Sequence, residues 1–194
     1  MHLMSYATWL LPWNTRSEAT IQLIKIGMYY IMRCGNQENQ CFGGSNEDNY
    51  ETPFDAWKLI FDKVGTDRQV WCPFYCEGSL TEHLNKLGVS FIHRDEDFYA
   101  YEPEYDIIVD NPPYSTKEKV FKRCIELGKP FALLVPLDTL ERKYISKLFD
   151  IDKLEIIIPN QRYNFKGGQN KKNCPFKSIW LCYDMKLGKQ LIYE

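Results

Sequence analysis

Residues 105–115 read Tyr-Asp-Ile-Ile-Val-Asp-Asn-Pro-Pro-Tyr-Ser, an apolar β-branched run followed by two consecutive prolines. The run at 105–109 predicts a buried parallel strand. Because proline neither pairs within a sheet nor continues a helix, the chain must leave the sheet at Asn111. Such strand ends are where α/β folds bind ligands. A rigid Asn-Pro-Pro-Tyr segment there offers a carboxamide, a carbonyl and an aromatic face, which together can grip a planar substrate carrying an exocyclic amine.

Size and composition indicate one globular domain. The chain has 194 residues, enough for a single sizeable core, and its 44% hydrophobic and 15% aromatic content favours a folded protein. A formal net charge of −2 gives no overall electrostatic case for nucleic-acid binding, so a polyanion contact needs a local basic patch. A lysine cluster around Gly167-Gly168 provides one, although a solvated turn explains it equally well: Lys166, Lys171, Lys172 and Lys177.

The cysteines bear on the compartment and on metal binding. Seven cysteines without a convincing signal peptide indicate reduced thiols, so we expect a cytoplasmic protein, or a nuclear or viral-factory one if the source is a eukaryotic virus. The apolar stretch 9–13 is too short to span a bilayer. Cys34, Cys41, Cys72 and Cys76 are irregularly spaced for zinc, and free cysteines often pack as small apolar residues. We therefore expect no metal.

The first quarter of the chain differs from the rest. Residues 21–32 are apolar enough for a helix, but residues 33–50 are rich in Gly, Asn and Gln and are typical of a loop or linker. From Thr52 onward the helical and extended patterns alternate. We therefore interpret residues 1–49 as an N-terminal extension or linker and residues 50–194 as the functional domain.

Within that domain the patterns predict an α/β fold with a mostly parallel sheet. Thr52-Pro53 favours a helix start with Thr52 as N-cap, and Gly65 ends that helix. A capping box at Ser115–Glu118 opens another helix. We expect the last two strands to be antiparallel neighbours that finish the sheet. The other predicted helices lie at 79–87 and 140–149, and the strands at 69–72, 89–93, 105–109, 131–136, 154–159 and 177–183.

A strand, a turn containing Gly78 and a helix follow one another at residues 70–87, an arrangement that brings backbone N–H groups close to a ligand. With Asn-Pro-Pro-Tyr, the chain resembles the amino-methyltransferases that use S-adenosylmethionine, whose signature is [D/N/S]-P-P-[Y/F/W]. The turn is similar to the D-P-F-x-G-x-G cofactor loop of adenine methyltransferases. Pro73, Phe74 and Gly78 match that pattern, whereas Cys72 replaces its leading acid and its first glycine is Cys76 or absent.

The resemblance covers about residues 50–183 and implies a Rossmann-like class I methyltransferase, phage-like or large-virus-like, with a mostly parallel sheet and an antiparallel C-terminal hairpin. It implies S-adenosylmethionine as cofactor, with its adenosine part held by Asp95, Asp97 and Phe98 and its methionine end near Thr52-Pro53. An acidic solvated turn and an ordinary helix start are the plain alternatives for these two segments. The cofactor-contacting set is completed by Cys72, Pro73, Phe74, Gly78 and Asn111.

The same resemblance assigns catalysis to Asn111, Pro112, Pro113 and Tyr114. The Asn111 side chain and the Pro112 carbonyl would accept hydrogen bonds from the target amine, and Tyr114 would stack on the base. A base inside a duplex would first have to be flipped out. Aromatic and lysine side chains around residues 160–176 suit stacking and phosphate contact, although they could also simply pack on the sheet. The expected substrate-binding residues are Tyr114, Ser115, Phe165, Lys166, Lys171, Lys172 and Phe176.

The resemblance implies adenine-N6 methylation of nucleic acid, with DNA slightly favoured over RNA. Two alternatives stay open at this point. One is methylation of a glutamine side-chain amide in a protein. The other is a non-catalytic subunit that binds nucleic acid or an active partner, since the cofactor loop departs from the family pattern.

Overall fold

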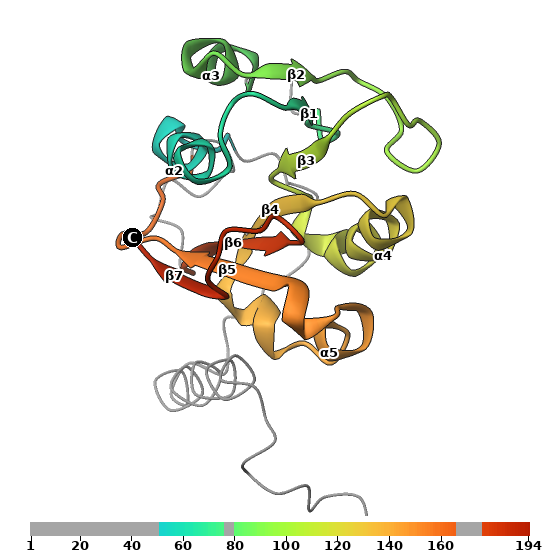
Figure 1. Cartoon of the computed structure of the whole chain (residues 1–194), viewed down its shortest axis with the longest axis vertical. Helices are drawn as coiled ribbons and strands as arrows, with labels where there is room; N and C mark the ends of the chain where they lie inside the picture. The colour runs from blue at the N-terminus through green and yellow to red at the C-terminus, as the bar shows by residue number, and fades with distance from the viewer. Residues whose placement is uncertain (1–50, 76–79, 166–175) are drawn as a thin grey trace, which may run out of the picture.

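The computed structural model describes residues 51–75, 80–165 and 176–194, in which helices cover both faces of a mixed seven-stranded sheet (Figure 1). The predicted extension at residues 1–49 lies outside the described residues. No helix within the described ranges is long and apolar enough to cross a membrane. The fold class expected from the sequence, Rossmann-like α/β with an antiparallel C-terminal pair, is confirmed.

The strand order is β2-β1-β3-β4-β6-β5-β7. Strands β1, β2, β3 and β4 run parallel to one another, whereas β6 is antiparallel to both β4 and β5. The β1, β2 and β3 ends therefore lie at one edge, where open α/β sheets bind ligands. The strands are β1 (Gln69–Trp71), β2 (Ser90–Ile92), β3 (Ile107–Asp110), β4 (Phe131–Pro136), β5 (Leu154–Ile158), β6 (Ser178–Tyr183) and β7 (Leu191–Tyr193).

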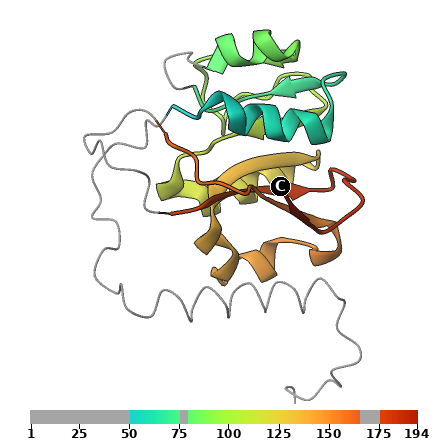
Figure 2. The same ribbon diagram turned by 90° about the vertical axis from the view of Figure 1, so that its left-hand side faces the viewer.

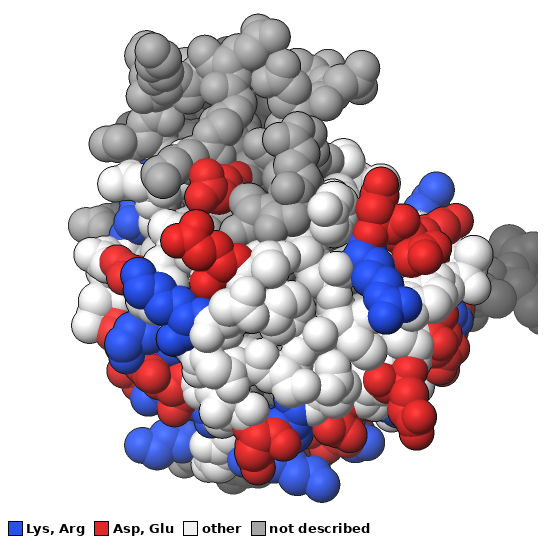
Figure 3. Space-filling view, turned by 90° about the horizontal axis from the view of Figure 1, so that it is seen from above, with Lys and Arg blue, Asp and Glu red and all other residues white. Residues whose placement is uncertain are grey.

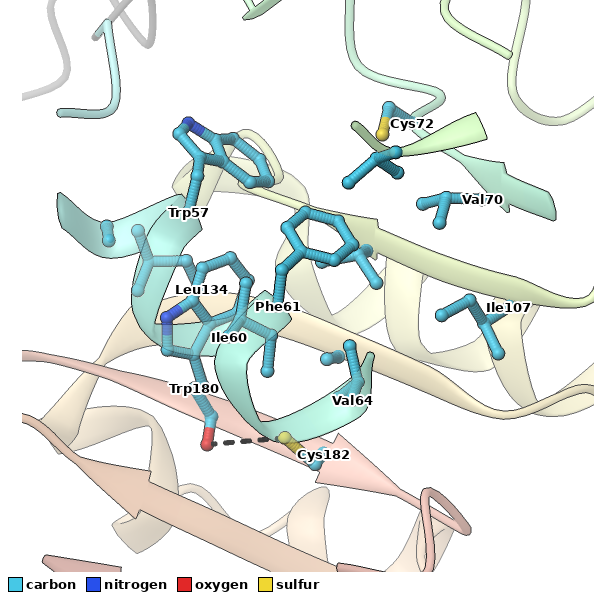
Figure 4. Packing of buried hydrophobic residues seen from close by; sticks show 14 of the residues in the cluster. Trp57, Ile60, Phe61, Val64, Val70, Cys72, Ile107, Leu134, Trp180 and Cys182 are labelled. Atoms are coloured by element: carbon cyan, nitrogen blue, oxygen red, sulfur yellow. Dashed lines mark hydrogen bonds between the residues drawn. The ribbon is translucent and has the colours of Figure 1, made fainter. Parts of the chain in front are cut away.

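Two cores lie on the two faces of the sheet because neighbouring strand residues point to opposite sides. Helices α2 (Phe54–Val64) and α3 (Leu80–Leu87) cover one face, and α2 faces the viewer in Figure 2. Helices α4 (Lys117–Leu127) and α5 (Ile145–Leu148) cover the other face. Figure 4 shows the first core, where Trp57 of α2 meets Trp180 of β6 with ring centroids 5.6 Å apart. This packing fixes α2, and with it the segment that precedes it, against the sheet.

Two predicted helix starts are wrong in detail. Helix α2 begins at Phe54 with Pro53 as its N-cap and without a side-chain cap, because Thr52 bonds to a distant residue instead. The predicted capping box is replaced by a 3₁₀ turn, η2 (Tyr114–Thr116), after which α4 begins without a side-chain cap. The two prolines directly precede that turn, in which the Thr116 N–H donates to the Pro113 carbonyl at 3.2 Å.

Two further expectations need correction. The single helix predicted at 140–149 is a 3₁₀ turn, η3 (Leu137–Glu141), followed by the one-turn helix α5, because Arg142 adopts an extended conformation between them. The sheet does not finish at residue 183. After a turn with positive φ at Asp184, Lys186 and Gly188, β7 pairs in parallel with β5. A further 3₁₀ turn, η4 (Ile151–Lys153), leads into β5.

Candidate active site

A cavity of about 350 Å³ lies where β1, β2 and β3 end. Its walls come from the segment before α2, the turn after β1, the loop after β2 and the end of β3. This volume lies within the usual range of small-molecule sites, about 300–1,000 Å³. The lining residues that matter below are Thr52, Phe74, His93, Asp97, Asp110 and Asn111.

Asn111 is held at this cavity by a long-range contact. Its Nδ2 donates to the Thr52 hydroxyl at 2.9 Å, which joins the end of β3 to the segment before α2. Thr52 is only 5% exposed. With the amide nitrogen engaged, Oδ1 is left as an acceptor that is buried and has no hydrogen-bond partner among the described residues. Such a group costs about 1–3 kcal/mol if it stays unpaired, which favours a donor from a ligand or substrate.

Asp110 is the most buried carboxyl group of the site, at 2% exposure. Its Oδ2 accepts the Phe74 N–H and its Oδ1 accepts the Asn111 N–H, both at 2.7 Å. The side chain thus ties the turn after β1 to the end of β3. Burial raises the pKa of Asp110 to about 8, although the two N–H groups partly offset the effect.

His93 follows β2 and also lines the cavity. Its Nδ1 lies 2.9 Å from the Cys72 carbonyl, which can only accept, so Nδ1 carries the proton. Burial lowers the pKa of His93 below its usual value, although the Cys72 carbonyl partly opposes that effect. A neutral ring protonated at Nδ1 leaves Nε2 as an acceptor. The Tyr75 ring lies beside the imidazole, with centroids 4.9 Å apart.

The acidic loop after β2 supplies polar groups and one aromatic wall. Asp95 and Asp97 line the cavity and are exposed, and the Asp97 carboxylate accepts the Tyr99 N–H at 2.9 Å. Phe98 is 5% exposed and packs against Phe74, with ring centroids 5.1 Å apart. The predicted residues of the loop and of the turn after β1 therefore meet across one cavity. The described lining contains no lysine or arginine.

Other predicted site residues lie apart from this lining. The ring centroids of Tyr114 and Phe176 lie 5.6 Å apart, and the Lys117 Nζ lies 5.9 Å from the Tyr114 ring centroid. Phe165 packs against the α2-side core and beside Tyr163. Among the residues predicted to contact cofactor or target, those not in the described lining are Pro53, Cys72, Pro112, Tyr114, Ser115, Phe165 and Phe176.

Four predicted residues cannot be placed, because Gly78, Lys166, Lys171 and Lys172 lie outside the described residues. Conversely, Asp110 and His93 were missed as site residues. Their position in the sequence could have identified them, because each lies at the end of a predicted strand and next to a predicted site motif. The described residues contain no group of three or more His, Cys, Asp or Glu side chains arranged to hold a metal ion.

The charged surface of the face viewed from above is mixed in sign (Figure 3). On the face seen in Figure 3, acidic and basic side chains surround an uncharged centre. Within the described part of this face, no broad basic area is drawn. A polyanion would have to bind elsewhere or through a narrow strip of contacts.

Comparisons with known proteins yield similar folds. No family model and no curated protein matches the chain. Solved structures with a similar fold include the following three. TrmN from Thermus thermophilus is 14% identical with a TM-score of 0.39, over 66% of this chain and 47% of its own, so this chain spans about half the length of TrmN.

The second is a candidate RNA methyltransferase from Pyrococcus horikoshii, 11% identical with a TM-score of 0.48, over 87% of this chain and 97% of its own. The third is a methyltransferase from Pyrococcus furiosus, 10% identical with a TM-score of 0.39, over 84% and 98%. Identities this low relate folds alone, and these TM-scores carry no argument about activity. Function is therefore inferred from the chain's own residues.

Proposed function

We propose that this chain is an S-adenosylmethionine-dependent methyltransferase acting on an exocyclic amine of a nucleic-acid base, adenine N6 in particular, with DNA ahead of RNA. One observation carries the proposal. The Asn111 carboxamide, anchored by Thr52, stands at the wall of an acidic cavity and retains an unpaired buried acceptor. An amine N–H is the donor that such an acceptor needs.

The charges of the cavity favour a cationic cofactor. Three exposed carboxylates line it, from Asp95, Glu96 and Asp97, beside the buried carboxyl group of Asp110, and the described lining has no lysine or arginine. Nucleotide cofactors with phosphates would be repelled, since anions are bound by cationic side chains and N–H groups. S-adenosylmethionine carries a net positive charge and no phosphate, so it fits these residues.

The walls of the cavity suit the rest of that cofactor. Phe74 and Phe98 form an aromatic corner that can hold a flat adenine ring. Asp95 and Asp97 offer carboxylates to ribose hydroxyl groups, in hydrogen bonds that are charge-assisted. The neutral His93 Nε2 adds an acceptor on the same side.

In the proposed reaction the bound cofactor supplies an electrophilic methyl group. Asn111 Oδ1 accepts one N–H of the target amine, and the Pro112 carbonyl accepts the other. Holding both N–H groups directs the nitrogen lone pair toward the methyl donor. Such orientation can lower a barrier by about 7–11 kcal/mol, so no strong base is required. The amine proton leaves to water after transfer.

The choice of a nucleic-acid substrate rests on Tyr114 and its surroundings. Its ring packs edge-on against Phe176, and the Lys117 ammonium approaches the same ring. Aromatic faces combined with lysines suit base stacking and phosphate contact. A target base in a duplex would have to flip out to reach Asn111.

The proposal is tested by transfer of tritium from labelled S-adenosylmethionine into separate DNA, RNA and protein pools. We expect label in N6-methyladenine of DNA, lost in Asn111→Ala and kept in the control Asn85→Ala, which alters an exposed asparagine on α3. Label in protein glutamine would reassign the substrate. Absence of both label and thermal stabilisation by the cofactor would overturn the proposal in favour of a non-catalytic protein.

A further inference from the structure

The hydrogen bonds of the Asp110 carboxyl group leave it able to accept a further contact from a ligand. A carboxylate has about four lone-pair sites, and the Phe74 and Asn111 N–H groups occupy one on each oxygen. The side chain lines the cavity although it is 2% exposed. Remaining acceptor capacity on both oxygens is therefore held in a buried, fixed position.

No described cation accompanies this carboxyl group. The salt bridges among the described residues do not include Asp110, and the cavity that it lines has three other acidic side chains. A buried carboxylate without a counter-charge is costly, and a cation reaching it would relieve that cost. The arrangement is incomplete without a positive charge from outside the described chain.

The position of Asp110 next to Asn111 indicates which positive group of the cofactor would approach it. A methyl donor must lie about 3–3.5 Å from the nitrogen that Asn111 holds. The sulfonium that carries the methyl group must then lie close to Asn111, and Asp110 is the preceding residue of the same strand end. The ammonium group of the cofactor, at the far end of a flexible chain, has no such constraint.

We propose that Asp110 is the counter-charge of the cofactor sulfonium and therefore makes the site prefer S-adenosylmethionine over its net-neutral product, S-adenosylhomocysteine. This inference rests on the proposed function and deepens it, since it names the residue that distinguishes cofactor from product. Loss of the sulfonium charge in the reaction removes the partner of Asp110. Product release is thereby favoured at the moment the methyl group has been transferred.

Binding of S-adenosylmethionine is then coupled to release of the Asp110 proton. Near pH 7 the free protein holds Asp110 largely protonated, because burial raises its pKa to about 8. A sulfonium lowers that pKa, so S-adenosylmethionine displaces most of one proton to the buffer, whereas the product displaces little. The described titratable groups around Asp110 come from every element that lines the cavity or packs behind it. They are Cys72, Tyr75, His83, His93, Asp95, Glu96, Asp97, Tyr99 and Cys124.

The test is calorimetric titration of the purified protein with each of the two ligands, in buffers of different ionisation enthalpy near pH 7. We expect wild-type protein to bind S-adenosylmethionine at least about tenfold more tightly than the product, and to release a proton only with the former. Asp110→Asn should remove most of that preference and the proton release. Glu96→Gln, which deletes a charge from an exposed position in the same lining, should change the preference by less than about threefold.

Each other outcome has a definite meaning. Equal weakening of both ligands by Asp110→Asn would overturn the inference and assign the carboxylate to the ammonium, which both ligands carry. If the Asp110→Asn variant does not fold, the wild-type comparison decides, because proton release that is equal for both ligands also overturns the inference. Failure of both ligands to bind wild-type protein would instead reject the proposed function.

Discussion

Asp110 and Glu155 are two buried carboxyl groups with the same local hydrogen bonding and different surroundings. Each accepts two backbone N–H groups: Asp110 from Phe74 and Asn111, Glu155 from Lys186 and Leu187. Asp110 is 2% exposed and Glu155 is 7% exposed. Backbone partners and burial alone therefore do not distinguish a structural carboxylate from one that serves a ligand.

The charges around each group make the distinction. Glu155 shares its hollow with three lysines, Lys153, Lys186 and Lys189, and it secures the turn that leads β6 into β7. Asp110 faces a cavity whose described lining has carboxylates and no lysine or arginine. Glu155 thus lies in a hollow of mixed charge that the fold itself supplies, with Asp152 and Asp184 beside the lysines, whereas the described lining around Asp110 offers no lysine or arginine. Asp110 lies where β3 ends and Glu155 lies near the start of β5, so the two carboxyl groups belong to opposite ends of the sheet. Mutations can test whether the roles of these two ends differ.

The largest expected effect concerns the cavity end. Asn111→Ala should lower methyl transfer by about 10³-fold, because the oriented acceptor of the target amine is lost, with cofactor affinity changed by less than about threefold. Single-turnover assays and calorimetry measure the two quantities. Thr52→Val keeps the shape of the anchor but removes its hydroxyl, so a smaller loss, about tenfold, should follow. A mutant whose loss lies wholly in cofactor affinity would contradict the role given to Asn111.

Glu155→Ala should show the opposite pattern. Two partly buried N–H groups lose their acceptor, which lowers the free energy of unfolding by about 2 kcal/mol. Urea denaturation measures this change, and methyl transfer per folded molecule should stay within about twofold of wild type. A stable Glu155→Ala protein with lost activity would break the division between the two ends of the sheet.

The pH dependence of stability is the next test of the contrast. The pKa of Asp110 is raised from an unfolded value near 4 to about 8, so the folded state binds a proton that the unfolded state releases. This contribution is fully present below about pH 4 and is lost as pH rises toward 8. Between pH 5 and pH 7 we expect wild-type protein to lose about 2 kcal/mol relative to Asp110→Asn, as measured by urea denaturation at each pH. An unchanged difference between the two proteins would show that Asp110 is ionised over this range.

The smallest effect belongs to the exposed acidic loop. Asp97→Ala should weaken cofactor binding by about fivefold, since a solvated carboxylate contributes about 1 kcal/mol, and it should leave the proton release intact. Calorimetry measures both. A loss of turnover at saturating cofactor would show that Asp97 acts in the chemical step.

Much of the site could be expected from local patterns. The β-branched run at 107–109 and the two prolines that end it are local signals, and they correctly set Asn111 at a strand end. The strand at 131–136 is also predicted correctly, because it is a continuous apolar run. All six of its residues are buried. One failure occurred where a local signal competed with a distant partner. Thr52 matches a helix cap in sequence, but its hydroxyl bonds to Asn111, which is 59 positions away.

The sequence by itself determined the alternation of helices and strands and the break at Asn-Pro-Pro-Tyr, because hydrophobic period and proline geometry act over a few residues. Only the tertiary structure decided that Asp110 receives the Phe74 N–H, 36 positions away, and that β7 joins the sheet beside β5. Such contacts depend on strand order and register, which no local period encodes. The same dependence gathers four carboxyl groups around one cavity and leaves Asp110 without a described cation.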